Sequence, residues 1–81
     1  MNAQKLVKMV NEIASFFEAE TDRNAVLEGV AGHLKRFWDP RMRRDIVRWV
    51  DEHGGEGLKE TALVAIRTHR DKLVPSEKPN P

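Results

Sequence analysis

The side chains that could perform acid–base, nucleophilic or metal chemistry are few and scattered in this sequence of 81 residues. The three histidines, His33, His53 and His69, are separated by twenty and sixteen residues, whereas two metal ligands on one helix are spaced three or four residues apart. Because the sequence contains no cysteine, a disulfide framework, a zinc ribbon and a thiol nucleophile are excluded. Neither serine, Ser15 nor Ser76, has a base nearby in the sequence. We therefore expect no catalytic residue, no bound cofactor and no metal ligand in this chain.

Cationic side chains, in contrast, gather in one short stretch. Residues 35–48 contain six of them and only two acids, Asp39 and Asp45. The six cations are Lys35, Arg36, Arg41, Arg43, Arg44 and Arg48. Arg41, Arg44 and Arg48 follow an i, i+3, i+7 spacing, which places them along one face of a helix. The spacing also predicts that Asp45 pairs with Arg41 and Arg48 within this arginine stripe.

Three interpretations of the arginine stripe remain open. It can be a solvent-exposed helix face with surface ion pairs, each contributing about 0–1 kcal/mol. It can be a docking site for another protein, because the planar guanidinium group forms paired hydrogen bonds and is weakly hydrated. It can also contact a nucleic-acid backbone. The net charge of +1 and the pI of about 8.2 disfavour this third interpretation, because such domains usually have a pI above about 9.

Four amphipathic segments position these side chains. Apolar residues recur with helical spacing over about residues 2–18, 23–38, 40–53 and 56–73. Thr21 or Asp22 and then Asp39 can cap the second and third helices, and Gly54–Gly55 can end the third. No segment alternates apolar and polar residues for long enough to form a strand. We predict an all-α fold, a small bundle of about four helices in a single domain over residues 1–74, followed by a flexible Pro-rich tail over residues 75–81.

The apolar residues near the second and third helices divide into core and surface. We expect Phe37 and Met42 to join the core and Trp49 to fill it, because they extend the apolar stripes of their helices. Trp38 lies on the flank of its stripe, beside the Asp39–Pro40 break. A tryptophan in such a place either fills the core or anchors a partner.

Two glycines interrupt the second helix. Gly29 and Gly32 each cost about 1 kcal/mol relative to alanine inside a helix. Such a cost indicates that another backbone approaches closely, and a neighbouring helix of the same chain is the simpler explanation.

The composition, 40% hydrophobic and 33% charged, is that of a soluble globular protein. The sequence has no apolar run of the roughly 18 residues needed to span a membrane and no signal-peptide pattern at its beginning. The absence of cysteine agrees with a reducing cytoplasm. A chain this short buries about 60% of its unfolded surface, so we expect a thin core that a partner helps to stabilise.

Two segments and a glycine turn carry a resemblance to a known family. The longest segment is His33-Leu34-Lys35-Arg36-Phe37-Trp38-Asp39-Pro40-Arg41-Met42-Arg43. The others are Asn11-Glu12-Ile13-Ala14-Ser15-Phe16-Phe17 and Gly54-Gly55-Glu56-Gly57-Leu58. Together they resemble the signature of the delta subunit of the soluble NAD-dependent formate dehydrogenase. The resemblance spans about residues 4–70 and depends most on the Phe-Trp-Asp-Pro-Arg-Met-Arg run, whereas the segment after Leu58 departs most.

The resemblance implies a small accessory subunit of a cytoplasmic bacterial complex that oxidises formate to carbon dioxide and reduces NAD. In that family the alpha subunit carries a molybdenum or tungsten bis-molybdopterin guanine dinucleotide cofactor and iron–sulfur clusters. The beta and gamma subunits carry FMN and further clusters. The delta subunit has no redox centre and is associated with assembly, stability or cofactor loading. A cysteine-free chain agrees with this picture, because it has no thiolate to bind an iron–sulfur cluster.

We therefore expect the junction of the second and third helices to dock on the catalytic alpha subunit. The residues expected at this interface are His33, Trp38, Asp39, Pro40, Arg41, Arg43, Arg44 and Arg48. Asp39 is expected to cap the third helix and Pro40 to set the turn, while Trp38, Arg41 and Arg43 reach the partner. Two alternatives remain: a small helical nucleic-acid-binding domain that uses the arginine-rich third helix, and a free-standing chaperone that holds the catalytic subunit before cofactor loading.

Overall fold

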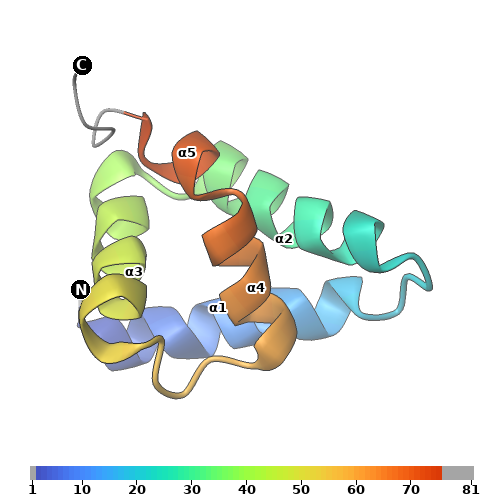
Figure 1. Ribbon diagram of the computed structural model, residues 1–81, viewed down its shortest axis with the longest axis horizontal. Coiled ribbons are helices and arrows are strands. Elements are labelled where there is room, and N and C mark those ends of the chain that lie inside the picture. Colours follow the sequence, from blue (N-terminus) through green and yellow to red (C-terminus); the bar gives the residue numbers. More distant parts are fainter. Residues whose placement is uncertain (1, 76–81) are drawn as a thin grey trace.

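The structure is a computed structural model that describes residues 2–75, and these residues form helices and connecting turns. The helices are α1 (Ala3–Phe17), α2 (Arg23–Phe37), α3 (Pro40–His53), α4 (Glu60–Thr68) and α5 (Arg70–Leu73). In Figure 1, α1, α2 and α3 form three sides of a frame, and α4 runs through its middle and packs against α2. The predicted all-α bundle with four main helices is confirmed. Of the tail predicted for residues 75–81, only Pro75 lies within the described residues.

Side-chain caps fix where the first three helices begin. Asn2, Asp22 and Asp39 each accept a hydrogen bond from a backbone N–H in the first turn of α1, α2 and α3, at 2.8, 3.0 and 2.9 Å respectively. Pro40 occupies the first position of α3, where its missing N–H costs nothing. A cap of this kind stabilises a helix by about 1 kcal/mol. The predicted breaks before α2 and α3 are confirmed.

The turn between α3 and α4 is longer than the sequence pattern predicts. Gly54, Gly55 and Gly57 have positive φ angles of 66°, 71° and 89°, which glycine adopts without strain. Gly54 ends α3 as predicted. The next helix begins at Glu60 rather than near residue 56, because residues in the left-handed region cannot continue a right-handed helix. The predicted fourth helix also divides at His69 into α4 and α5.

The hydrophobic core takes side chains from all five helices. The buried residues are Leu6, Val7, Val10, Ala14, Val26, Leu27, Val30, Ala31, Leu34, Trp38, Ile46, Val47, Val50, Ala62, Ala65, Ile66, Leu73 and Val74. Trp49 packs against this core, half-buried, and its indole N–H donates to the backbone oxygen of Glu56 at 2.9 Å. Trp49 therefore contributes to the core, as predicted, and also holds the glycine turn against α3.

The structure reverses the predicted roles of Phe37 and Trp38. Trp38 is 5% exposed and belongs to the core, whereas Phe37 is 71% exposed. The helical pattern fails here because α2 ends at Phe37, and Trp38 has extended backbone angles, φ −88° and ψ 140°. The prediction that Phe37 joins the core is wrong, and the buried Trp38 does not present the surface expected of a partner anchor. Met42 packs against the core as predicted.

The polar face of α1 binds the segment that leads into α4. Asn11 donates a hydrogen bond to the backbone oxygen of Gly57 at 2.9 Å and accepts one from the backbone N–H of Lys59 at 2.8 Å. The ammonium group of Lys59 donates to the Glu18 carboxylate at 2.6 Å, and the Thr61 hydroxyl donates to the same carboxylate. These hydrogen bonds hold the pKa of Glu18 below its ordinary value of 4.5, and the bond from Lys59 has the largest effect. Polar contacts thus fix the beginning of α4 on α1.

Candidate partner interface

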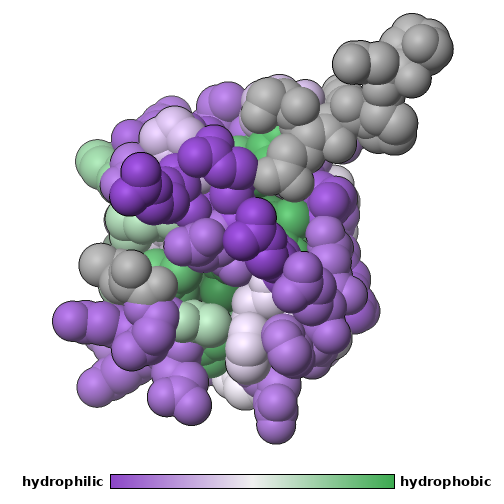
Figure 2. Space-filling model, turned by 90° about the vertical axis from the view of Figure 1, so that its left-hand side faces the viewer, coloured by the Kyte–Doolittle hydropathy of each residue, from purple (hydrophilic) through white to green (hydrophobic). Residues whose placement is uncertain are grey.

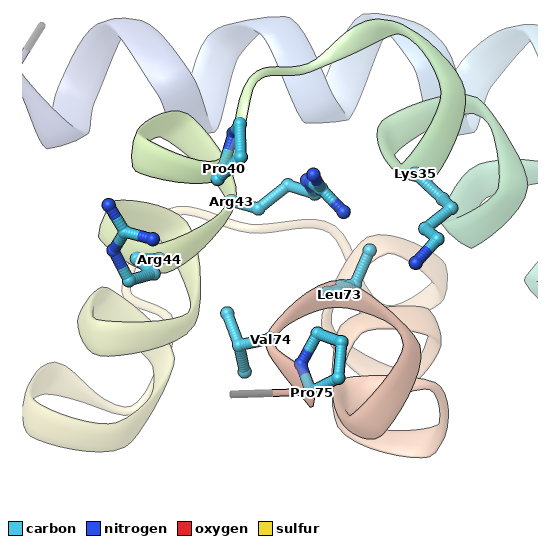
Figure 3. A pocket seen from close by; sticks show the side chains of 7 residues that line it. All are labelled: Lys35, Pro40, Arg43, Arg44, Leu73, Val74 and Pro75. Carbon is cyan, nitrogen blue, oxygen red and sulfur yellow. The ribbon is translucent and has the colours of Figure 1, made fainter. Parts of the chain in front are cut away.

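Three of the predicted interface residues meet at a pocket beside α3 (Figure 3). The described residues that line it are Lys35, Pro40, Arg43, Arg44, Leu73, Val74 and Pro75. We call it the cationic pocket, and its volume is about 230 Å³. One side comes from α2 and α3, and the other comes from the end of the described chain. Three of the lining residues are cations and none is an acid, so the pocket attracts anions.

Arg43 is the cation of this pocket that has a buried nitrogen without a hydrogen-bond partner among the described residues. In Figure 3 its side chain extends from α3 toward Lys35 of α2, above Leu73. Its Nε is buried and has no hydrogen-bond partner within the described part of the chain, although buried polar groups are normally paired. The ammonium group of Lys35 donates to the backbone oxygen of Lys72 at 3.1 Å. None of the ion pairs found between residues 2 and 75 includes Lys35, Arg43 or Arg44, so their charges are not neutralised there.

The other members of the arginine stripe lie outside the cationic pocket. Arg41 and Arg48 are exposed and do not line it. The predicted pairing of Asp45 with Arg41 and Arg48 is wrong, since no ion pair of the described residues includes them. Exposed arginine side chains gain little from such pairs. Figure 2 shows that the face carrying α3 is mostly hydrophilic, with apolar atoms visible between the polar side chains.

Two more of the predicted residues have other places in the structure. Asp39 is exposed and caps α3 through its hydrogen bond to the N–H of Met42. His33 lies between aromatic rings, with ring centroids 6.4 Å from Phe17 and 4.8 Å from Phe37. The two pockets that His33 lines share no lining residue with the cationic pocket. The predicted interface is therefore divided between two surfaces and the core.

The second surface is aromatic and lies between α1 and α2. Phe16 and Phe37 are 75% and 71% exposed and are the exposed large hydrophobic residues of the described chain. Phe16 contacts Phe17 edge to face, with 5.2 Å between ring centroids. We call Phe16, Phe17, His33 and Phe37 the aromatic surface. Exposed apolar groups that adjoin one another in this way are typical of interaction sites.

The two glycines of α2 differ in their surroundings. A Cβ atom at Gly29 would lie 2.4 Å from the ring of Phe17, so the close neighbour belongs to another helix of the chain, as predicted, but it is a side chain rather than the predicted backbone. A Cβ atom at Gly32 would have no neighbour within 4 Å. The predicted close internal neighbour is therefore wrong for Gly32. The Cβ position of Gly32 faces open space, in a pocket that Phe17, His33 and Phe37 also line.

Sequence reasoning missed one side of the cationic pocket and most of the aromatic surface. Leu73, Val74 and Pro75 reach the pocket because α5 packs against both α2 and α3. Helical spacing does not encode this meeting of distant segments. Lys35 could have been predicted from the sequence, since it belongs to the cluster of six cations in residues 35–48. The exposure of Phe16 could also have been predicted, because Phe16 widens the apolar stripe of α1 beyond what one helix face buries.

The described helices include none with the length and apolar character needed to cross a membrane. Among residues 2–75 no group of three or more His, Asp or Glu side chains is arranged to hold a metal ion.

The sequence matches a known protein family over most of its length. Residues 5–66 match the NADH-dependent formate dehydrogenase delta subunit, FdsD. The chain belongs to this family. The match includes most of α1, all of α2 and α3, the glycine turn and most of α4. No curated protein and no solved structure matches the chain.

Membership of the delta-subunit family confirms the resemblance, and the structure shows what some of the resembling residues do. FdsD is a small subunit of an NAD-dependent formate dehydrogenase complex, which supports the prediction of a non-catalytic subunit of an oxidoreductase. Asn11 and Gly57, in two of the segments that resemble the family, bond to each other, and Asp39 caps α3. These residues serve the fold. The side chains of Arg41 and Arg43, in the segment from His33 to Arg43, take part in none of the ion pairs of the described residues.

Proposed function

We propose that this delta subunit is an accessory subunit that docks on the catalytic alpha subunit of a cytoplasmic formate dehydrogenase complex. It supports the assembly, the stability or the molybdenum/tungsten cofactor loading of that subunit, and the beta and gamma subunits belong to the same complex. The observation that carries the proposal is the cationic pocket, where three cations meet without an acid. Its α2 and α3 residues lie inside the family match.

Docking through residues 38–44, which we call the α2–α3 corner, agrees with the chemistry of its side chains. Arginine suits protein interfaces because its planar group forms paired hydrogen bonds and is weakly hydrated. Arg41, Arg43 and Arg44 take part in none of the ion pairs of the described chain. A partner can therefore pair with these arginines without first breaking ion pairs inside the delta subunit. The exposed Arg41 and Arg48, which lie outside the cationic pocket, accelerate association through their charge.

In this proposal the redox cofactors reside in the other subunits. These are the molybdenum or tungsten bis-molybdopterin guanine dinucleotide cofactor, iron–sulfur clusters and FMN. Cluster ligands are usually cysteine thiolates, and this chain has no cysteine, so its side chains do not fit an iron–sulfur cluster. The delta subunit then contributes a binding surface to the complex rather than a step of electron transfer.

The experiment that tests the proposal is co-purification of the tagged full-length chain with formate-oxidising activity through gel filtration. The wild-type chain is expected to elute with the catalytic subunit. Arg43→Glu is expected to lower the binding constant at least tenfold, which is about 1.4 kcal/mol. The fold should remain, because the new carboxylate lies beside Lys35 and Arg44, and circular dichroism checks this.

Arg67→Glu is the matched control, since Arg67 is an exposed residue of α4 and its substitution changes the charge equally. It should co-purify like the wild-type chain. A wild-type chain that elutes apart from the complex would contradict the proposal. A chain found only with cofactor-free catalytic subunit would favour the chaperone alternative. Binding to nucleic acid that falls steeply with salt would favour the other alternative.

A further inference from the structure

The cationic pocket is a small, partly open hollow. Its volume of about 230 Å³ is below the roughly 300–1,000 Å³ of pockets that enclose small-molecule ligands. Leu73 and Val74, which line it, are only 2% and 4% exposed, so their positions are fixed by the core. The pocket is therefore preformed and small, and it suits one acidic group rather than a large anion.

The donors of the pocket favour a planar acceptor. Within residues 2–75, the Nε of Arg43 is the buried side-chain nitrogen that has no hydrogen-bond partner. This atom is closed to a ligand, whereas the two Nη groups at the end of a guanidinium lie side by side and match the two oxygens of a carboxylate. Lys35 lies across the pocket from Arg43 (Figure 3), and its bond to the backbone oxygen of Lys72 limits its movement. A carboxylate placed between Arg43 and Lys35 would neutralise both.

The apolar lining favours a carboxylate that is carried on a hydrocarbon stem. Pro40, Leu73, Val74 and Pro75 supply four of the seven lining residues. The methylene groups of an Asp or Glu side chain would contact these apolar residues, and their removal from water would favour binding. Inorganic phosphate has no such group. The combination of cations and apolar side chains thus points to an acidic side chain of a protein.

We propose that the cationic pocket binds an Asp or Glu side chain from an acidic segment of the partner subunit. The carboxylate lies between Arg43 and Lys35, and Arg44 lies at the edge of the pocket. The identity of the partner rests on the proposed function, whereas the preference for a carboxylate is a property of this chain alone. The proposal also divides the arginines of α3: Arg43 and Arg44 bind the partner, and Arg41 and Arg48 act through their charge at a distance.

The first measurement follows the Nε–H resonance of Arg43 in the ¹⁵N-labelled full-length chain. The probe is N-acetyl-glutamate N-methylamide, and its control is the glutamine counterpart, which has the same shape without the charge. The glutamate probe is expected to shift the resonance with a Kd of about 1–10 mM, and the glutamine probe is expected to leave it in place. No response to glutamate, or tenfold tighter binding of inorganic phosphate, would overturn the proposal.

The same titration of Glu77→Gln tests whether the chain uses its own carboxylate. Glu77 follows Pro75 by two positions in the sequence. An unchanged Kd for the glutamate probe supports an external ligand. A Kd that falls tenfold when Glu77 is replaced would mean that Glu77 competes for the pocket, and the partner's acidic side chain would not be its occupant.

The second measurement compares three variants in co-purification with the complex. Arg43→Gln should weaken binding at least tenfold, and Arg43→Lys should give an intermediate loss because it keeps the charge without the paired donors. Arg41→Gln, the control with the same change of charge outside the pocket, should weaken binding less than about threefold. If the wild-type chain co-purifies and Arg43→Gln binds as well as Arg41→Gln, the pocket proposal fails while the proposed function stands. If the wild-type chain does not co-purify, the proposed function fails and the titrations decide the pocket.

Discussion

At the scale of single residues, the two glycines of α2 show that one residue type can have opposite effects three positions apart. The methyl group of Gly32→Ala meets no atom within 4 Å, and alanine favours a helix over glycine by about 1 kcal/mol. We expect Gly32→Ala to raise the free energy of unfolding by about 0.5–1 kcal/mol. Gly29→Ala must displace the ring of Phe17 and should show no such gain. Urea unfolding of the wild-type chain and both variants measures the difference. Equal gains would contradict the packing of α1 on α2.

Glu18 links stability to pH through its bonds to α4. Its pKa is lowered in the folded chain by the hydrogen bonds from Lys59 and Thr61, so the folded state binds a proton less readily than the unfolded state. The stabilisation is therefore present above the ordinary pKa of 4.5 and is lost as the pH falls through the folded pKa. We expect the melting temperatures of the wild-type chain and Glu18→Gln to differ most near neutral pH and to converge in acid. Melting curves over a pH series test this, and a difference that is equally large far below pH 4.5 would refute it.

At the scale of elements, the end of α2 decides which of two neighbouring aromatic residues belongs to the core. Trp38→Ala is expected to lower the free energy of unfolding by about 3–5 kcal/mol, because it empties a buried site. Phe37→Ala, at an exposed site of the aromatic surface, should cost less than about 0.5 kcal/mol. Chemical denaturation of the two variants gives the comparison. A larger loss for Phe37→Ala would restore the roles that helical spacing predicts.

The elements that depend on local chemistry could be predicted from the sequence, and those that depend on distant contacts could not. Asp22, Asp39–Pro40 and Gly54 mark helix ends, because caps, prolines and left-handed glycines act within a few residues. The orientation of Trp38 depends on the extended backbone after α2. The start of α4 depends on a turn that Asn11 of α1 holds from 46 residues away.

The same division applies to the candidate site. Pro40, Arg43 and Arg44 could be proposed as interface residues from the cation cluster together with the resemblance to the delta-subunit family, and the structure brings them together at one pocket. The side formed by Leu73, Val74 and Pro75 could not, because it exists only where α5 meets α3. The burial of the Arg43 Nε, which separates this arginine from Arg41, is likewise a property of the folded chain.

At the scale of the whole molecule, two surfaces with different chemistry are separable. The cationic pocket and the pockets beside the aromatic surface share no lining residue. Phe37→Ala therefore tests the aromatic surface in the same co-purification that tests Arg43→Glu. The account assigns the decisive contact to the cationic pocket, so Arg43→Glu should reduce binding more than Phe37→Ala does.

The most direct measurement is an electron cryo-microscopy structure of the assembled formate dehydrogenase complex. The account predicts that the α2–α3 corner of the delta subunit faces the catalytic alpha subunit, with an Asp or Glu carboxylate of that subunit at hydrogen-bond distance from the guanidinium group of Arg43. A complex in which this corner faces solvent, while the delta subunit is held by another surface or is absent, would contradict it.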